Sequence, residues 1–146
     1  MSKKQKPDFQ RKKPNRAPAP KVVIACEGAK TEREYFQALK LSLGLASVIL
    51  LVPHKTTDPR NIVEQAKTEK RKYIAQKAWE IHDAAWAVFD GDEHLLEDPN
   101  NWNDALQTAQ ANKIELAISN PCFEFWYLLN FRDRNAPLTR QQALTE

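Results

Sequence analysis

"KVVIACEGAKTEREYFQALKLSLG", residues 21–44, decides the fold class. Its first five residues form a short, β-branched, almost continuous apolar run, which is typical of a strand buried on both faces of a parallel sheet. A helix is expected next, because Thr31 and Glu34 have capping-box spacing and apolar residues then recur at helical intervals. Gly44 is expected to end this helix. The stretch therefore predicts one strand followed by one helix.

The same alternation continues along the chain. Further strands are predicted at residues 46–52, 84–89 and 114–119. Further helices are predicted from Asp58-Pro59 to about residue 74, from about Trp102 to Asn112, and from Asn120-Pro121 to about residue 131. Alternating strands and helices predict an α/β fold, with a mostly parallel sheet of about four strands and helices on both faces. Residues 140–146 resemble the start of a helix too short to stabilise itself.

Length and composition indicate one cytosolic domain. The chain has 146 residues, of which 42% are hydrophobic, enough for one packed core and too few for two ordinary domains. No apolar run approaches the roughly 20 residues that a membrane span needs, and the N-terminus is charged where a signal peptide is apolar. We therefore expect a domain over residues 21–146, no membrane partner and a cytoplasmic location.

The beginning of the chain differs from the rest in charge. Residues 1–21 contain eight lysines and arginines against one aspartate, a formal charge of +7, which leaves −4 for the remainder of a chain whose total is +3. Four prolines and few apolar side chains predict that residues 1–20 form a disordered arm. Such an arm is expected either to bind nucleic-acid phosphates or to act as a solubilising tail. The candidate phosphate-binding residues are Lys12, Lys13, Arg16 and, outside the arm, Lys55.

Several familiar sites are absent from the sequence. The two cysteines, Cys26 and Cys122, are too few for a disulfide framework and form no zinc-site spacing with the three histidines. The three glycines of the chain form neither a P-loop nor the glycine-rich dinucleotide fingerprint. An anion could still bind at the helix N-terminus near Thr31, although ordinary capping also explains that residue.

Polar residues follow the predicted strands at the ends where parallel α/β sheets bind ligands. Glu27 follows the first strand, and Asp90 and Asp92 follow the third, separated only by Gly91. In an extended chain the two aspartates would point to the same side, and two carboxylates held together favour a bound cation. Hard oxygen ligands without thiolates suit Mg²⁺ or Mn²⁺. The alternative is an ordinary polar turn, because DxD triplets are common in loops.

Three segments, in order, resemble the RloB-like family: "VIACEGAKTEREYF", "AVFDGDEH" and "ISNPCFEFWYLLNF", between about Val22 and Phe131. This family is associated with restriction and phage-defence loci and is regarded as having a TOPRIM-like fold. TOPRIM domains serve topoisomerases, primases and nucleases. The resemblance implies a divalent-metal site made by a glutamate after the first strand and an Asp-x-Asp after the third, which Glu27, Asp90 and Asp92 match.

Other residues of these segments are candidates for the same site. Glu32 matches a polar position after the glutamate, but its charge also suits the first turn of a helix. His94 is close enough in sequence to join the site, although an ordinary surface loop would show the same pattern. Asn120 fits a helix cap, whereas Glu124, a lone acid among aromatics, either faces solvent or joins the site, because buried unpaired carboxylates are costly. The aromatics are expected to be core residues.

The preferred hypothesis is a metal-dependent phosphodiester hydrolase that acts on DNA or RNA in phage defence. Asp90 and Asp92 would hold Mg²⁺ or Mn²⁺, and Glu27 would be a third ligand or the base for the attacking water. The alternative is a noncatalytic module of a defence or restriction complex, which binds nucleic acid or a protein through the basic arm. A primase-like nucleotidyl transfer would need the same acids. Family members usually continue further, so the end at Glu146 suggests a C-terminally truncated member.

Overall fold

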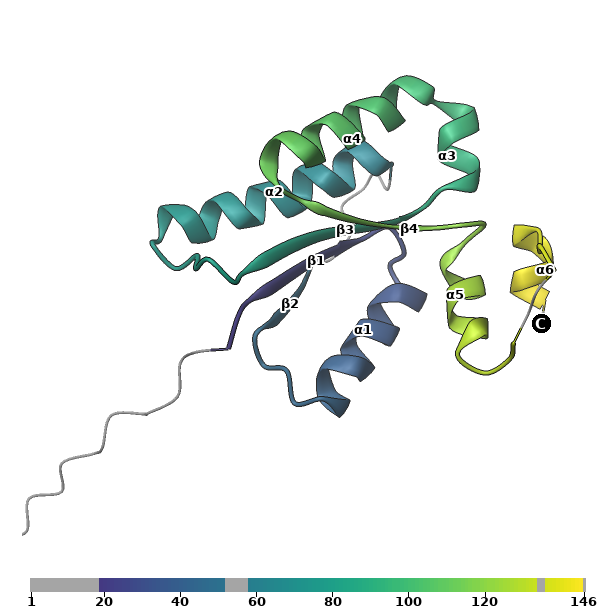
Figure 1. The fold of residues 1–146 in the computed structure, drawn as a ribbon, viewed down its shortest axis with the longest axis horizontal. Coiled ribbons are helices and arrows are strands. Elements are labelled where there is room, and N and C mark those ends of the chain that lie inside the picture. Colours follow the sequence, from purple (N-terminus) through teal and green to yellow (C-terminus); the bar gives the residue numbers. More distant parts are fainter. Residues whose placement is uncertain (1–18, 52–57, 134–135, 146) are drawn as a thin grey trace, which may run out of the picture.

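Strand β1, Val22–Cys26, lies inside a parallel sheet (Figure 1). The computed structural model describes residues 19–51, 58–133 and 136–145. Within these ranges the sheet has four strands in the order β2-β1-β3-β4, and all the pairings are parallel. The remaining strands are β2 (Val48–Leu51), β3 (Ala84–Asp90) and β4 (Glu115–Ser119). The predicted parallel α/β sheet is therefore confirmed.

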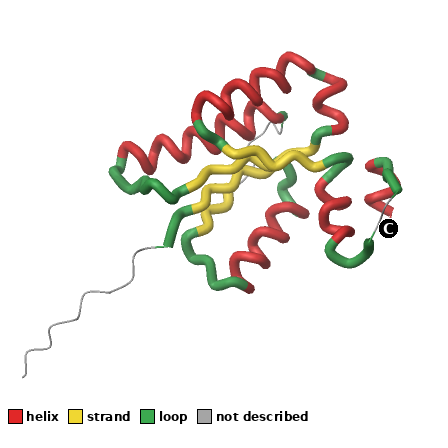
Figure 2. The backbone as a smooth tube through the Cα atoms, in the orientation of Figure 1, coloured by secondary structure: helices red, strands yellow, loops and turns green. Residues whose placement is uncertain are grey.

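Helices cover both faces of the sheet (Figure 2). Helices α2 (Pro59–Ala75) and α4 (Pro99–Asn112) pack together on one face. Helices α1 (Thr31–Ser42) and α5 (Phe123–Leu129) lie on the other. Two short helices complete the described part of the chain: α3 (Asp92–Glu97) leads into α4, and α6 (Arg140–Thr145) packs beside α5.

The core has one apolar layer on each side of the sheet. Alternate residues of β1 enter different layers, so Val23 joins the layer under α2 and α4, and Ile24 joins the layer next to α1 and α5. Small residues such as Ala66 and Ala105, both 0% exposed, let α2 and α4 approach the sheet closely. Burial on both faces explains why β1 and β3 are continuous apolar runs rather than alternating ones, whereas β4 at the sheet edge is partly exposed.

Helices α2 and α4 begin with the same signal. Asp58 and Asp98 are their N-caps, each is followed by proline, and each side chain accepts a hydrogen bond from a backbone N–H three residues later. The start predicted for α2 is confirmed, whereas α4 begins earlier than the predicted Trp102. The amide of Asn101 joins the two helix ends, since it donates to Asp58 Oδ1 over 2.7 Å.

Two predicted helix starts are wrong. Thr31 is the first residue of α1, whose N-cap is Lys30 without a side-chain hydrogen bond. Just before the helix, the Gly28 N–H donates to Glu32 Oε1 over 3.1 Å. Asn120 is not a cap either. The Asn120-Pro121 peptide is cis, and α5 begins only after Cys122, which is 0% exposed and packs into the core.

The terminal helix α6 forms although the sequence predicts that it is too short to be stable. Thr139 and Gln142 make a reciprocal capping box: the Thr139 N–H donates to Gln142 Oε1 over 2.9 Å, and the Gln142 N–H donates to Thr139 Oγ1 over 3.3 Å. Ala143 is buried, and α6 packs against α5. Capping and tertiary contacts therefore compensate for the short length of α6.

The basic arm cannot be compared with the structure, because residues 1–18 lie outside the described residues, as does Lys55. Ala19 and Pro20 are exposed and lead into β1. In the described ranges, no helix combines the length and the apolar character that crossing a membrane requires.

Asp83 connects the start of β1 to the segment before β3 through hydrogen bonds. Its side chain is 1% exposed and accepts hydrogen bonds from the backbone N–H of Lys21 over 2.6 Å and of Glu80 over 2.8 Å. Burial acts to raise the pKa of Asp83, but the hydrogen bonds from Glu80 and Lys21 prevail and hold it below its ordinary value. The ionised form is therefore the one that stabilises the fold.

Asp83→Asn is expected to lower the free energy of unfolding by about 1–3 kcal/mol at pH 7, because an amide cannot accept both backbone hydrogen bonds with equal strength. Because the pKa of Asp83 is lower in the folded chain than in the unfolded chain, the ionised side chain stabilises the fold at pH values above the unfolded-state pKa of about 4. This stabilisation is lost as the pH falls below that value. The difference between the variant and wild type should thus shrink at pH 3. Urea unfolding at both pH values measures it, with exposed Asp104→Asn as the control; a constant difference contradicts the prediction.

Candidate acidic site

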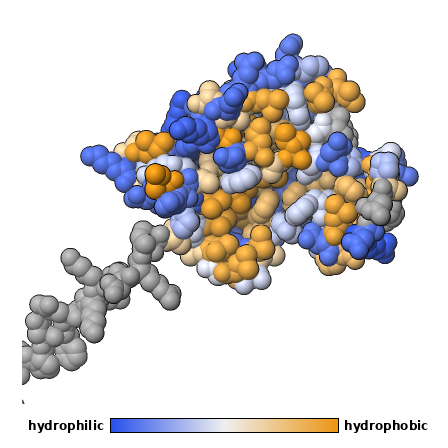
Figure 3. Space-filling model, in the orientation of Figure 1, coloured by the Kyte–Doolittle hydropathy of each residue, from blue (hydrophilic) through white to orange (hydrophobic). Residues whose placement is uncertain are grey.

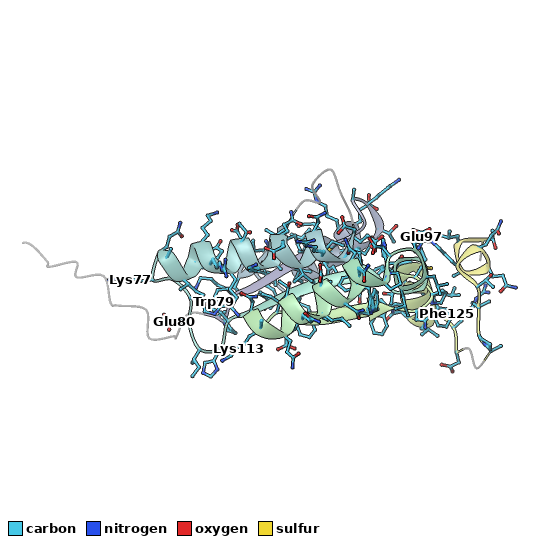
Figure 4. The ribbon with its side chains drawn as sticks, turned by 90° about the horizontal axis from the view of Figure 1, so that it is seen from above. Lys77, Trp79, Glu80, Glu97, Lys113 and Phe125 are labelled. Atoms are coloured by element: carbon cyan, nitrogen blue, oxygen red, sulfur yellow. The ribbon has the colours of Figure 1, made fainter. Side chains whose placement is uncertain are left out.

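The predicted site residues Glu27 and Asp90 meet at the carboxyl ends of neighbouring strands. The backbone N–H of Glu27 continues the pairing of β1 with β3, since it donates to the Val88 carbonyl over 2.9 Å. The backbone N–H of Asp90 then donates to Glu27 Oε2 over 2.8 Å. In Figure 4, Glu97 of α3 and Phe125 of α5 mark this end of the molecule. The two acids are therefore brought together by the sheet itself.

The second oxygen of Glu27 contacts a histidine. His94 Nε2 lies 2.8 Å from Glu27 Oε1, and the two side chains are 20% and 16% exposed. His94, for which a place in the site and a surface loop were the alternatives, lies in α3, which follows β3 directly. Glu27 thus bridges the end of β3 to α3, and its carboxylate stays open to solvent on one side.

Asp90 is held from two further helices. Its Oδ1 accepts a hydrogen bond from the backbone N–H of Phe123, the first residue of α5, over 2.9 Å. Its Oδ2 lies 3.3 Å from Arg140 Nη1, and the Asp90 side chain is 6% exposed. Arg140 was not among the predicted site residues, because nothing in the sequence places residue 140 beside residue 90.

The surroundings of Asp90 disfavour its negative charge. Burial, together with repulsion from Glu27 and Glu32, raises the pKa of Asp90 to about 7. The Arg140 guanidinium and the Phe123 N–H act in the opposite direction but do not cancel the effect. Near neutral pH the described side chains therefore leave this carboxylate short of positive charge.

Glu32 forms a second buried acidic position next to Glu27. It is 5% exposed, and its Oε1 accepts the Gly28 N–H over 3.1 Å. A Cβ at Gly28 would overlap the Glu32 carboxylate, so a larger residue there would displace that side chain. Burial raises the pKa of Glu32, backbone hydrogen bonds lower it, and repulsion from Glu124 and Glu27 raises it further. Of the remaining candidate residues, Glu124 is half-buried and its charge helps to raise the pKa of Glu32, whereas Asn120 is exposed.

The expected geometry of the Asp-x-Asp is wrong. Gly91 has helical angles, φ −102° and ψ −23°, and Asp92 is the first residue of α3, so the two aspartates do not follow one another in extended chain. Gly91 is closely packed, because a Cβ there would lie 2.9 Å from Ile118 Cγ2. The side chain of Asp92 lies outside the described part of the structure.

A model of the family described as RloB-like protein matches residues 22–146. The chain belongs to the RloB-like family. The match includes every described residue of the acidic site, from Glu27 to Arg140. No curated protein and no solved structure matches the chain. The family resemblance seen in the sequence is thereby confirmed.

The donor atoms of this RloB-like site fit a hard divalent cation. Glu27 accepts the Asp90 N–H, and repulsion from Glu27 adds to burial in raising the pKa of Asp90, so a cation near both carboxylates would relieve that repulsion. Mg²⁺ commonly uses one or two protein carboxylates and completes its shell with water and phosphate oxygens. Among the described side chains no three acids, histidines or cysteines form a ready metal cluster, and Asp92 stays the predicted additional ligand.

An apolar cleft adjoins the acidic site of the RloB-like chain. It has a volume of about 530 Å³ and lies between α1, β4 and α5; its aromatic lining consists of Tyr35, Phe36, Phe123, Phe125 and Trp126. Figure 3 shows apolar side chains gathered below the sheet on the visible face. The expectation that the aromatics are core residues holds for Phe123, which is 3% exposed, but is wrong for Trp126 at 50% and Phe131 at 69%.

The two cysteines of the chain are buried free thiols. Burial, with a further contribution from Glu32, raises the pKa of Cys26 to about 12. Burial likewise raises the pKa of Cys122 to about 11, with repulsion from Glu124 as a smaller cause. Since the thiolate is the reactive form, neither cysteine is suited to act as a nucleophile at neutral pH.

Proposed function

We propose that this RloB-like chain is a metal-dependent phosphodiester hydrolase that acts on nucleic acid. The observation that carries the proposal is that Glu27 binds the backbone N–H of Asp90 at the ends of β1 and β3, where burial and the charge of Glu27 both disfavour ionised Asp90. This is the edge at which parallel α/β sheets bind ligands. A role in phage defence and a TOPRIM-like character belong to the same proposal and rest on the family resemblance alone.

Each described residue has a role that follows from its contacts. When bound, Mg²⁺ or Mn²⁺ supplies charge neutralisation at the phosphate and an acidified water. Asp90 and, by sequence, Asp92 would hold the cation, and Glu27 would either complete the shell or take the proton of the attacking water. His94 lies against Glu27 Oε1, where it orients that carboxylate and can receive the proton from it.

The proposal is tested first by calorimetric titration of the purified chain with Mn²⁺, then with Mg²⁺. Wild type is expected to bind, and the Asp90→Asn, Asp92→Asn double variant is not. The matched control is Asp104→Asn, which removes one exposed carboxylate that pairs with Arg60. Binding by wild type justifies a screen of DNA and RNA substrates for hydrolysis, whereas equal binding by wild type and the double variant rejects the assigned ligands.

A second candidate function is a noncatalytic module that binds nucleic acid or a defence-complex protein. The specific observation in its favour is the ion pair of Arg140 with Asp90, which gives the buried acid a partner from the chain itself. On this reading the acidic cluster only joins β3 to α6. If the chain is such a module, it should bind nucleic acid without hydrolysing it, and Asp90→Asn should not change this binding.

The basic arm is expected to supply much of the affinity for nucleic acid. Removal of residues 1–20, which carry seven of the lysines and arginines, should reduce the slope of log K against log salt concentration. We expect a reduction of roughly 3–6 in that slope, since each neutralised phosphate contributes about 0.9. Fluorescence anisotropy with single- and double-stranded DNA and RNA measures it. An unchanged slope would leave the arm as a solubilising tail.

A further inference from the structure

We propose that Arg140 is the residue that binds the substrate phosphate, and that Asp90 holds its guanidinium in the metal-free chain. The inference rests on the proposed function and assigns a role to a side chain that the sequence does not connect with the site. It follows from where Arg140 lies, what it contacts and what it would contact once a divalent cation occupied the carboxylates.

Arg140 reaches inward from the surface of the molecule. It is the first residue of α6, its side chain is 32% exposed, and its Nη1 lies 3.3 Å from the nearly buried Oδ2 of Asp90. The other Asp90 oxygen already accepts the Phe123 N–H. The guanidinium thus contacts the remaining oxygen of the carboxylate.

Arg140 and a divalent cation compete for the same oxygen. Two positive charges a few ångströms apart repel one another strongly in a partly buried site, and this repulsion is larger for a doubly charged ion. Occupation of the carboxylates by a cation is therefore expected to weaken the contact of Arg140 with Asp90.

The position of α6 permits this exchange. The helix is held by its own capping box, by burial of Ala143 and by packing against α5. A rotation of the Arg140 side chain therefore leaves the main core intact. Guanidinium groups suit phosphate because their parallel N–H groups match two of its oxygens and remain charged at any physiological pH.

Competition is tested by titrating wild type and Arg140→Gln with Mn²⁺ in the absence of nucleic acid. The variant is expected to bind Mn²⁺ on the order of tenfold more tightly, because a charge-assisted pair no longer opposes the cation. Arg71→Gln is the matched control, since that arginine is exposed and lies at the far end of α2, where its Nη2 contacts Asn112. Equal affinities in wild type and Arg140→Gln would overturn the inference alone. Absence of Mn²⁺ binding in every variant would overturn the proposed function with it.

The phosphate role is tested with a short phosphorothioate oligonucleotide at saturating Mn²⁺ and high salt, where binding by the basic arm is screened. Arg140→Gln should bind it at least tenfold more weakly than wild type, and Arg140→Lys should recover part of the loss, because lysine keeps the charge without the planar fork. A variant that gains Mn²⁺ affinity but binds the oligonucleotide as wild type does would overturn the phosphate role and leave Arg140 as a counter-ion of Asp90.

Discussion

Asp90→Asn is expected to lower metal-dependent hydrolysis of nucleic acid roughly a thousandfold, a loss typical of removing one group that stabilises charge in the transition state. An amide is a weaker ligand for Mg²⁺ or Mn²⁺ than a carboxylate, yet it has nearly the same shape. Its oxygen can still accept the Phe123 N–H, which Asp90 Oδ1 accepts in the wild type. Initial rates over a range of Mg²⁺ concentrations measure the effect on a substrate that wild type cleaves.

The control for this experiment is Asp104→Asn, because Asp104 is also an aspartate but is 54% exposed and pairs with Arg60 on the surface. It should retain the wild-type rate. Hydrolysis by Asp90→Asn at the wild-type rate would show that Asp90 is not part of the reaction, and the noncatalytic module would then be the better account of the chain.

The same substitution is expected to stabilise the metal-free protein at alkaline pH. The pKa of Asp90 is raised to about 7 by burial and by Glu27, so the folded chain binds this proton more tightly than the unfolded chain does. Stability from this group is greatest below about pH 4 and is lost as the pH rises from about 4 to about 7, opposite in sign to an ordinary surface carboxylate. Above that range, ionised Asp90 costs wild type on the order of 3 kcal/mol, which asparagine avoids.

We therefore expect Asp90→Asn to melt roughly 5–10 °C above wild type at pH 8 without metal, and close to wild type at pH 4. Circular dichroism melting curves in a chelator measure both values. A variant less stable than wild type at pH 8 would mean that the pair with Arg140 outweighs the burial of the charge. Together with the kinetic prediction, the result separates loss of chemistry from loss of fold, since a more stable variant cannot be inactive through unfolding.

The sheet could be predicted because apolar runs and helix signals act over a few residues. Each strand was found within about two residues of its position, as the run at 84–89 became Ala84–Asp90. Helix starts were less predictable, because one short signal can be overruled by a neighbour. Thr31 has capping-box spacing to Glu34 but is the first residue of α1 rather than its N-cap, whereas the unpredicted pair Thr139 and Gln142 does form a capping box.

The candidate site divides in the same way. Glu27 and Asp90 could be placed together because adjacent parallel strands end at one edge. Arg140 could not, because its position depends on how α6 packs against α5 rather than on any periodic pattern. The assumed extended geometry of Asp90 and Asp92 failed for a local reason, since the chain turns directly into α3 at Gly91.

The order of the strands also bears on how the protein folds as it is synthesised. Strand β1 precedes the others along the chain but lies between β2 and β3, so one of its edges has no partner until residues 84–90 have left the ribosome. An apolar strand with an open edge is prone to pair with other chains. The nascent protein is therefore most vulnerable to aggregation before β3 emerges, and substitutions that delay the docking of β3 should reduce soluble yield more than their effect on final stability implies.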